Sequence, residues 1–302
     1  MENHEFKFID LRLDWSFKYV YGRHGNEDLL LQLITALLPE KHICSVTLTG
    51  QEQMPDRRTQ RKAVFDVSCT TESGESFIIE MQYAQQKDFA NRMMYYSGFP
   101  IRDSVRAGGN IYSFKPVYVI GILDFLMPGV EPNGRVVNRY SVRNDMHPHD
   151  MLFDDWHCIT VELPKLGSDP AKLDALEKQL YVIKNSGSMA ERPDEFKSKS
   201  FDKLFGVINF ADMSEENQEM YESELRWILN RNSEIATARE NGLAEGMAKG
   251  EARGEARGEA RGRKEGLELG KLETARNLKA TGIDVEIISQ CTGLTLEQIA
   301  KL

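Results

Sequence analysis

Residues 63–82, AVFDVSCTTESGESFIIEMQ, constrain the fold more than any other stretch of the chain. Two apolar, β-branched runs flank a turn-forming segment, and this pattern predicts a β-hairpin. Asp66 and Glu80 interrupt the runs at positions where buried strands normally carry apolar side chains. A fold built around this hairpin must therefore accommodate two acids in or beside its core.

The turn decides whether the two acids meet. A three-residue loop over 72–74, closed by Gly74 in the left-handed conformation, sets Asp66 directly opposite Glu80. Directly opposed residues share one face of the sheet, with Cβ atoms about 5 Å apart. Gln82 points to that face as well, because side chains alternate along a strand. A two-residue loop would instead put the acids on opposite faces.

Two carboxylates this close repel each other, so the pKa of one rises unless a cation lies between them. Asp66 and Glu80 would suit Mg²⁺, with Mn²⁺ as the alternative, and the backbone carbonyl of Met81 would be a further ligand. Such a metal activates water toward a phosphoryl group, and Gln82 would orient that water through its amide oxygen. In the ordinary alternative both acids face solvent, balanced by the arginines at 57–61.

Strands and helices alternate along the first half of the chain, which predicts an α/β core. The expected helices are a short one from Asp14, one over 27–38 with Asn26 as N-cap, and one within 85–109 that reaches at least Pro100. Besides the hairpin, the expected strands lie within 42–51, 115–125, 139–143 and 157–166.

The second half of the chain changes character. Acid-rich amphipathic helices within 166–238 predict a helical extension packed on the core, 1–165. In the next segment, 239–271, glycine recurs at every fourth position around GEARGEARGEARG. Each glycine costs a helix about 1 kcal/mol relative to alanine, and like charges at i,i+4 repel. We therefore expect a hydrophilic, partly helical linker, with an oligomerisation stalk as the alternative.

The last segment, 272–302, predicts three short helices separated at Gly282 and Gly293, the last with a Thr295–Gln298 capping box. This spacing is typical of a helix-turn-helix. The final helix, LEQIAKL, has few side chains suited to reading bases, which favours packing on another copy over docking on DNA.

Composition excludes several classes of protein. A net charge of −9 argues against broad, nonspecific adhesion to nucleic acid, although local basic clusters occur at 56–62 and at Arg135, Arg139 and Arg143. No apolar run is long enough to span a bilayer, and no secretory signal is visible, so the expected location is the cytoplasm. The cysteines lack disulfide or metal-site spacing, and the histidines in MHPHD (146–150) are expected in a loop.

The chain contains, in order, DWSFK, FDVSCTTESGESFIIEMQ, NRMMYY, GGNIYSFKPVYVIGIL, VELPKL, YESELRW and TGLTLEQIAKL. The acid–acid–glutamine hairpin resembles the PD-(D/E)xK nuclease superfamily, with glutamine in place of the usual lysine. Over nearly its whole length the chain resembles the bacterial recombination-promoting nuclease (Rpn) family of transposase-like proteins. This resemblance implies a restriction-endonuclease-like α/β core with helices on both sides.

The resemblance also implies roles for individual residues. Asp66 and Glu80 would be the metal-binding acids, and Gln82 the third member of the motif. Asp14 would be the acid from the first helical region, holding metal through water; the alternative is an N-cap of 15–21.

DNA contacts are implied for Arg92, Tyr96 and Lys18. Arg92 and Tyr96 are one helical turn apart, and a guanidinium suits a phosphate bidentately, although a salt bridge is the ordinary alternative. The expected function is Mg²⁺-dependent endonucleolytic cleavage of DNA in recombination or transposition. The alternative is a non-cleaving DNA-binding or assembly protein that acts through the tail and C-terminal module and forms a homo-oligomer there.

Overall fold

The computed structural model describes residues 7–50, 52–53, 63–105, 113–130 and 133–302. The chain forms two compact units, Met1–Trp227 and Ile228–Leu302. The basic cluster at 56–62 and the glycine pair that was expected to end a helix at 108–109 lie outside the described residues. Among the residues described, no helix combines the length and hydropathy that crossing a lipid bilayer requires.

A six-stranded mixed sheet forms the centre of the first unit, in the order β1-β4-β5-β6-β8-β7. Its strands are β1 (Val46–Leu48), β4 (Val67–Thr71), β5 (Ser76–Gln82), β6 (Val117–Leu123), β7 (Val137–Tyr140) and β8 (Trp156–Glu162). Strands β5, β6 and β8 run parallel, while β1, β4 and β7 pair antiparallel with their neighbours. A separate short pair joins β2 (Glu52–Gln53) to β3 (Ala63–Val64).

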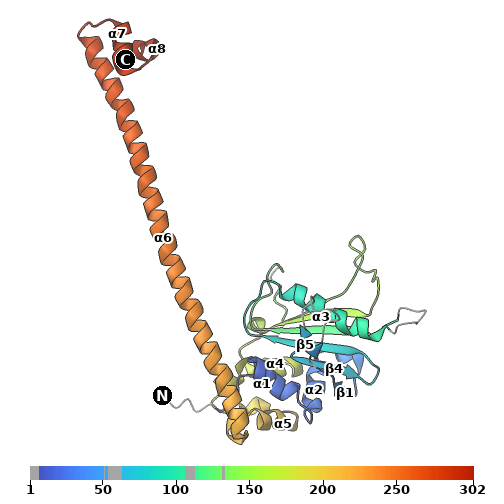
Figure 1. The fold of residues 1–302 in the computed structure, drawn as a ribbon. Helices are drawn as coiled ribbons and strands as arrows, with labels where there is room; N and C mark the ends of the chain where they lie inside the picture. Colours follow the sequence, from blue (N-terminus) through green and yellow to red (C-terminus); the bar gives the residue numbers. More distant parts are fainter. Residues whose placement is uncertain (1–6, 51, 54–62, 106–112, 131–132) are drawn as a thin grey trace. The chain divides into compact units, whose positions relative to one another are not determined.

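Helices cover both faces of this sheet, so the α/β prediction is confirmed. The α-helices of the first unit that end within it are α1 (Asp14–Tyr21), α2 (Glu27–Leu37), α3 (Phe89–Ser104), α4 (Ala175–Asn185) and α5 (Lys199–Val207). Helix α3 is the crossover between parallel strands β5 and β6, and it lies on one face while α1, α2 and α4 lie on the other (Figure 1). Short 3₁₀ turns lie at Pro39–Lys41, Leu163–Lys165, Pro170–Lys172, Ser186–Ser188, Asp194–Phe196 and Phe210–Asp212.

Helix ends differ from the sequence prediction in two places. Helix α1 begins at Asp14, but its N-cap is Leu13, which has no side-chain acceptor, so the N-cap alternative for Asp14 was wrong. Asn26 is the N-cap of α2 by position, yet its side chain makes no capping hydrogen bond. Helix α3 continues through Pro100 as far as Ser104.

The hairpin of β4 and β5 has the predicted three-residue loop. Gly74 has φ +86°, and its amide donates to the Thr71 carbonyl at 3.0 Å. The Thr71 amide donates in turn to the Glu75 carbonyl at 3.0 Å, and the ladder runs down to Val67 opposite Ile79. The positive φ explains why glycine is needed here, because side chains with a Cβ are strained in that conformation.

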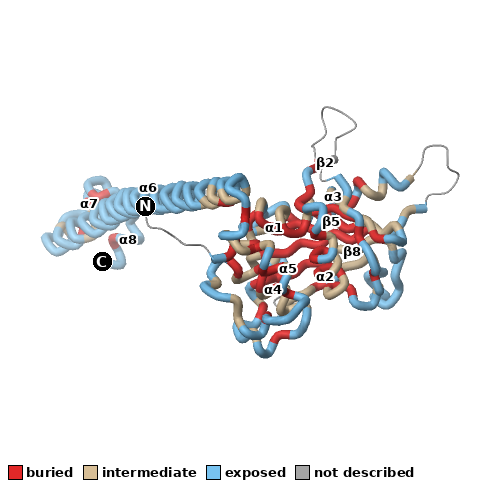
Figure 2. Tube along the Cα trace, turned by 90° about the horizontal axis from the view of Figure 1, so that it is seen from below, coloured by how far each residue is buried: buried red, intermediate tan, exposed pale blue. Residues whose placement is uncertain are grey.

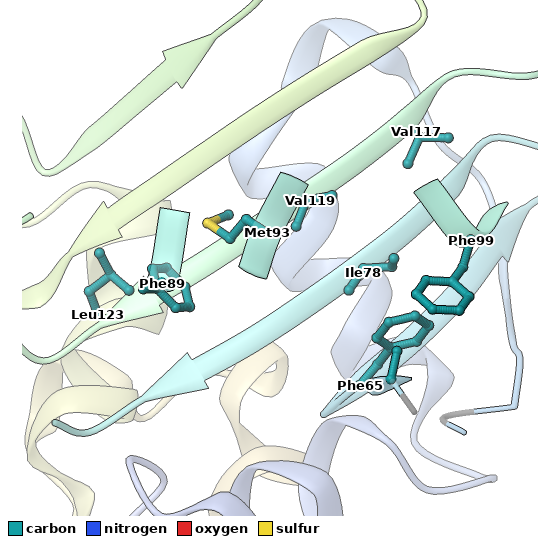
Figure 3. Packing of buried hydrophobic residues seen from close by; sticks show 9 residues of the cluster. Phe65, Ile78, Phe89, Met93, Phe99, Val117, Val119 and Leu123 are labelled. Carbon is teal, nitrogen blue, oxygen red and sulfur yellow. The ribbon is translucent and has the colours of Figure 1, made fainter. Parts of the chain in front are cut away.

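Helix α3 packs on β5 and β6 through a cluster of buried apolar side chains (Figure 3). The cluster contains Ala63, Phe65, Ile78, Phe89, Met93, Phe99, Val117, Val119 and Leu123. Figure 2 shows the strands of the sheet as the buried centre of this unit. Gly121 of β6 allows α3 to approach closely, because a Cβ there would lie 2.8 Å from the Phe89 ring.

Helix α6 (Glu215–Ala280) is continuous over 66 residues and includes the whole glycine-periodic segment. The boundary expected between 238 and 239 therefore falls inside a helix, and the segment expected to be partly helical is helical throughout. All residues from 229 to 270 are exposed. Opposite charges at i,i+4, as in Glu245–Lys249 and Arg261–Glu265, offset part of the cost of the glycines.

The second unit ends in a small helical module with its own core. The last turns of α6 pack with α7 (Val285–Thr292) and α8 (Leu296–Ala300). The buried residues are Ala275, Ile288, Leu294 and Ile299. Gly282 and Gly293 have positive φ at the breaks, and the Thr295–Gln298 capping box is present, as the sequence predicts.

Gly121→Ala should lower the free energy of unfolding by about 1–3 kcal/mol, because the added methyl group overpacks against the Phe89 ring. Gly98→Ala in α3 is the matched control: nothing lies within 4 Å of its Cβ position, so this change should stabilise the helix by up to about 1 kcal/mol. Urea unfolding measures both values. Equal stability of the two variants would contradict the close approach of α3 to β6.

Candidate functional site

The carboxylates of the two hairpin acids each accept a hydrogen bond from a backbone amide of the facing strand segment. The Asp66 amide donates to Glu80 Oε1 at 3.2 Å, and the Met81 amide donates to Asp66 Oδ2 at 2.8 Å. Asp66 is 5% exposed and Glu80 only 2% exposed. Both carboxylates therefore lie inside the fold, and the alternative that they face solvent on a one-sided sheet was wrong.

The end of the strand ladder explains this local arrangement. Regular pairing of β4 with β5 stops at Val67 opposite Ile79, one residue short of Asp66. Beyond that point the carboxylates of Asp66 and Glu80 accept hydrogen bonds from the backbone amides of Met81 and Asp66. Buried amides need such partners, so the backbone holds both carboxylates in place.

Helix α1 contributes a cation and a third acid to this pair. Lys18 Nζ lies 3.3 Å from Asp66 Oδ1 and 2.7 Å from Asp14 Oδ2. Asp14 and Lys18 are at i,i+4, so they share one face of α1. The structure thus brings both residues of the first helix to Asp66, with the Lys18 ammonium between the two carboxylates.

Helix α3 contributes a second cation. Arg92 Nη2 lies 3.4 Å from Glu80 Oε2, and its Nη1 donates to Gln86 Oε1 at 2.6 Å. Arg92 Nε is buried and has no hydrogen-bond partner in the described part of the chain. The guanidinium carbon lies 5.7 Å from the centre of the Tyr96 ring and 5.2 Å from that of Phe89. Arg92 therefore faces the acids with one N–H donor unused.

Burial dominates the protonation behaviour of the site. Desolvation raises the pKa of Glu80 to about 7, although Arg92 opposes this shift. Desolvation also raises the pKa of Asp66 well above its usual range, with repulsion from Glu80 adding to it. For Lys18, desolvation acts against the charged form, but the Asp66 and Asp14 carboxylates outweigh it and raise the pKa. Negative charge at this site thus needs a nearby cation.

Tyr96 responds to the same acids. Its pKa is raised, first by burial and then by the negative charge of Glu80. Its ring also packs edge-on against Phe65 at 5.0 Å between centroids. Tyr96 accordingly lies at the site, on the side of α3, as the helical spacing from Arg92 predicts.

Gln82 and Met81 lie at the end of β5. The Gln82 Nε2 donates to the Met81 carbonyl at 3.0 Å, so this proposed ligand oxygen already accepts a hydrogen bond. Gln82 shares the face of Glu80 because it lies two positions further along the strand. Its amide oxygen has no partner among the residues that the structure describes, and it can therefore accept a hydrogen bond from water.

The donor set can be compared with the needs of a divalent cation. Within the described ranges no group of three or more His, Cys, Asp or Glu side chains is arranged to hold a metal ion. Mg²⁺, however, commonly takes only one or two protein carboxylates and completes its shell with water and phosphate. Asp66 and Glu80 fit that requirement, because a cation would relieve the desolvation and repulsion that raise both pKa values.

Two supporting interactions were not expected from the sequence, and Glu224 of α6 makes the first. Its two carboxylate oxygens lie 3.0 and 3.2 Å from the Trp15 amide that donates to them. This carboxylate replaces the missing side-chain cap of α1, the helix that presents Asp14 and Lys18. Glu224 and Trp15 are 209 positions apart, so no local pattern could have revealed the contact.

Arg12 makes the second supporting interaction, at the carboxyl ends of β5 and β6. Its Nε and Nη2 donate to the two oxygens of Asp10 at 2.9 and 2.7 Å, and its Nη1 donates to Asp124 Oδ2 at 3.1 Å. The Asp124 amide donates to the Gln82 carbonyl at 2.9 Å. Arg12 thereby ties the N-terminal segment to the strand ends beside the site.

The free energy of unfolding of chelator-treated protein should fall as pH rises from about 4.5 to about 7. Folded Glu80 holds its proton up to about pH 7, against 4.5 for its ordinary value, so its contribution is complete at low pH and is lost above the folded pKa. Glu80→Gln should flatten this decline by on the order of 2 kcal/mol between about pH 5 and pH 8. Urea unfolding at about pH 5 and at about pH 8 measures this change in the free energy of unfolding. The control is Glu240→Gln, which replaces an exposed acid. An unchanged slope in Glu80→Gln would contradict the burial of this carboxylate.

Glu224→Ala should lower the free energy of unfolding by about 1 kcal/mol, because it removes the cap of α1. Glu224→Gln keeps an acceptor oxygen and should lose less. Glu222→Ala is the matched control on the same helix: its exposed i,i+4 pair with Arg226 should contribute no more than about 0.5 kcal/mol. Similar losses in all three variants would argue against a capping role.

A protein-family model described as PD-(D/E)XK nuclease family transposase matches residues 11–238. The matched range extends from α1 into α6 and includes the hairpin acids, Arg92 and Glu224. No curated protein and no solved structure matches the chain.

Proposed function

The chain belongs to the PD-(D/E)XK nuclease family of transposases, and on this premise we propose that it is a metal-dependent DNA endonuclease. It would hydrolyse phosphodiester bonds during recombination or transposition of mobile DNA. The observation that carries this proposal is the buried carboxylate pair of Asp66 and Glu80, locked by backbone amides and flanked by the cations Lys18 and Arg92.

Nucleases of the PD-(D/E)XK type generally use divalent metal ions. In this chain Asp66 and Glu80 would hold Mg²⁺, with Mn²⁺ as an alternative, and Asp14 would act through water. When bound, the ion supplies a Lewis acid that polarises a phosphoryl oxygen and lowers the pKa of water. The raised pKa values of both hairpin acids support this assignment, since each carboxylate gains its charge most readily next to a cation.

Arg92 is the residue best suited to hold the phosphate. Its guanidinium contacts Glu80, and its buried Nε has no partner among the described residues. A guanidinium binds phosphate bidentately through two N–H groups, so a phosphate would take Nη2 from Glu80 and share the adjacent Nε. Tyr96 supports the guanidinium through its ring face, which keeps the charge directed at the acids.

Gln82 and Lys18 would act on the nucleophile and on the charge of the site. The free amide oxygen of Gln82 would accept a hydrogen bond from the attacking water and orient it, but it cannot remove the proton as a base. Lys18 neutralises Asp66 and Asp14 before substrate arrives, and its ammonium would contact a phosphate when the acids take up a metal ion.

The net charge of −9 makes these few cations important for DNA binding. A strongly acidic protein gains little from nonspecific attraction to the phosphate backbone. Contact with DNA would therefore concentrate at Lys18 and Arg92, beside the two acids, rather than spread over the surface.

Purified protein should nick supercoiled plasmid with Mg²⁺ or Mn²⁺, and a chelator should abolish the nicking. Asp66→Ala and Glu80→Ala should each lower the rate by at least about 100-fold while the fold is retained, because each removes a carboxylate on which charge stabilisation depends. Arg92→Ala should lower the rate by on the order of 10- to 100-fold. Gel analysis of nicked and linear plasmid measures all of these rates.

Glu240→Ala, which replaces an exposed acid of α6, controls for loss of charge and should cleave at the wild-type rate. Nicking that persists in metal-purified Asp66→Ala protein would show that a contaminant or another site is responsible. DNA binding by the wild type without cleavage under either metal would instead favour the non-cleaving DNA-binding function.

A further inference from the structure

A surface hollow of about 540 Å³ lies along α1, next to the proposed active site. Its lining residues are Trp15, Lys18, Tyr19, Gly22, Arg23, His24 and Asn217. Apart from Lys18, none of them has a part in the function proposed above. The hollow lies within the range of small-ligand sites, and it opens to solvent.

Two aromatic side chains form a platform in this hollow. The rings of Trp15 and Tyr19 stack with centroids 4.8 Å apart and an interplanar angle of 15°. Both side chains are only partly buried, whereas Phe17 and Tyr21 on the opposite side of the same helix are fully buried. The Tyr19 ring is covered by Trp15 and by the Arg23 guanidinium, so the outer face of Trp15 is the flat surface that remains for a ligand.

The charge of the hollow is positive. None of its lining side chains is a carboxylate. The Arg23 guanidinium lies 5.2 Å from the centre of the Tyr19 ring and forms no ion pair within the described residues. The other basic side chains of the hollow already have acidic partners, since His24 contacts Glu27 at 3.1 Å and Lys18 contacts Asp14 at 2.7 Å. Arg23 is thus free to bind an anion beside the aromatic platform.

The hollow is continuous with the proposed active site through Lys18. This side chain lines the hollow, and its ammonium is 3.3 Å from Asp66 Oδ1. The platform is also held in position, because the Trp15 amide donates to the Glu224 carboxylate. A nucleic acid strand with a phosphate at Asp66 and Glu80 would therefore have the hollow and Trp15 within reach on the other side of Lys18.

We propose that this hollow binds unpaired nucleotides of DNA next to the phosphate that is cut. A base would stack on the outer face of Trp15, which Tyr19 supports from behind, while Arg23 contacts the backbone. Aromatic platforms combined with cations are the usual means of holding single strands, because every base has a face that can stack. Bases within a duplex are already stacked on one another, so the preferred substrate is single-stranded or locally unpaired DNA. The inference rests on the proposed function for its placement beside the cleaved bond.

Fluorescence anisotropy in the presence of a chelator measures binding without cleavage. The probes are a labelled single-stranded oligonucleotide and the duplex formed with its complement. Wild-type protein should bind the single strand more tightly than the duplex. Trp15→Leu should weaken single-strand binding by about 5- to 100-fold, which corresponds to the loss of one base–aromatic stack. Tyr19→Leu removes the ring that supports Trp15 and should weaken binding less.

Conservative variants separate stacking from folding. Trp15→Phe and Tyr19→Phe keep a ring and should retain most of the affinity. Phe153→Leu removes a partly exposed aromatic ring that does not line the hollow and should bind like the wild type. Thermal unfolding of every variant identifies any loss of affinity that follows from loss of the fold.

Arg23→Gln should weaken binding of both DNA forms and lower the salt dependence by about one phosphate contact. Its titration over a range of salt concentrations thus distinguishes a backbone contact from a stacking contact. An unchanged salt slope would remove Arg23 from the proposed subsite.

The outcomes separate this inference from the proposed function. Equal binding of single strand and duplex, or full affinity in folded Trp15→Leu and Tyr19→Leu, would overturn the inference even if the wild type nicks plasmid. Single-strand binding that depends on Trp15 and Tyr19, without cleavage of either DNA form, would support the subsite and overturn the nuclease proposal.

Discussion

The burial of two carboxylates side by side is the constraint on which the rest of this site depends. The Asp66 and Glu80 carboxylates accept from backbone amides at 2.8 and 3.2 Å, respectively, in a place where water cannot solvate their charge. Each therefore needs positive charge from elsewhere in the fold. Lys18 reaches them from α1 and Arg92 from α3, helices that lie on opposite faces of the sheet. At this end of the β4–β5 hairpin, the charges of the two acids can thus be balanced by Lys18 and Arg92 or by a bound cation.

The position of α1 is set by residues far away in the chain. This helix presents Asp14 and Lys18 to the hairpin, yet it lacks a side-chain cap of its own. Glu224, at the start of α6, supplies that cap. One short helix thus carries acid, cation and aromatic platform on neighbouring faces, so its orientation affects the proposed cleavage and the proposed strand binding alike.

Much of the core could be predicted because its signals are local. Gly74 specifies a three-residue loop, and the hairpin register that opposes Asp66 and Glu80 follows from it by counting. The other core strands and helices lie close to where periodicity indicates, except that β7 begins at Val137, two residues before the expected range 139–143, and the short pair of β2 and β3 was not predicted. The N-cap role for Asp14 failed because its helix is capped from another element. The glycine-periodic segment is helical although like charges repeat at i,i+4 within it; the opposite-charge pairs Glu245–Lys249 and Arg261–Glu265 offset only part of that cost.

The sequence by itself determined the hairpin, its register and the acid–acid–glutamine pattern, since backbone hydrogen bonding between adjacent strands depends on residues close together in the chain. Only the tertiary structure decided that both acids are buried, that Lys18 lies between two carboxylates and that Arg92 retains an unused donor. These properties arise from desolvation and charge pairing among elements distant in sequence. Their strength depends on distance and exposure, which no spacing of residues along the chain encodes.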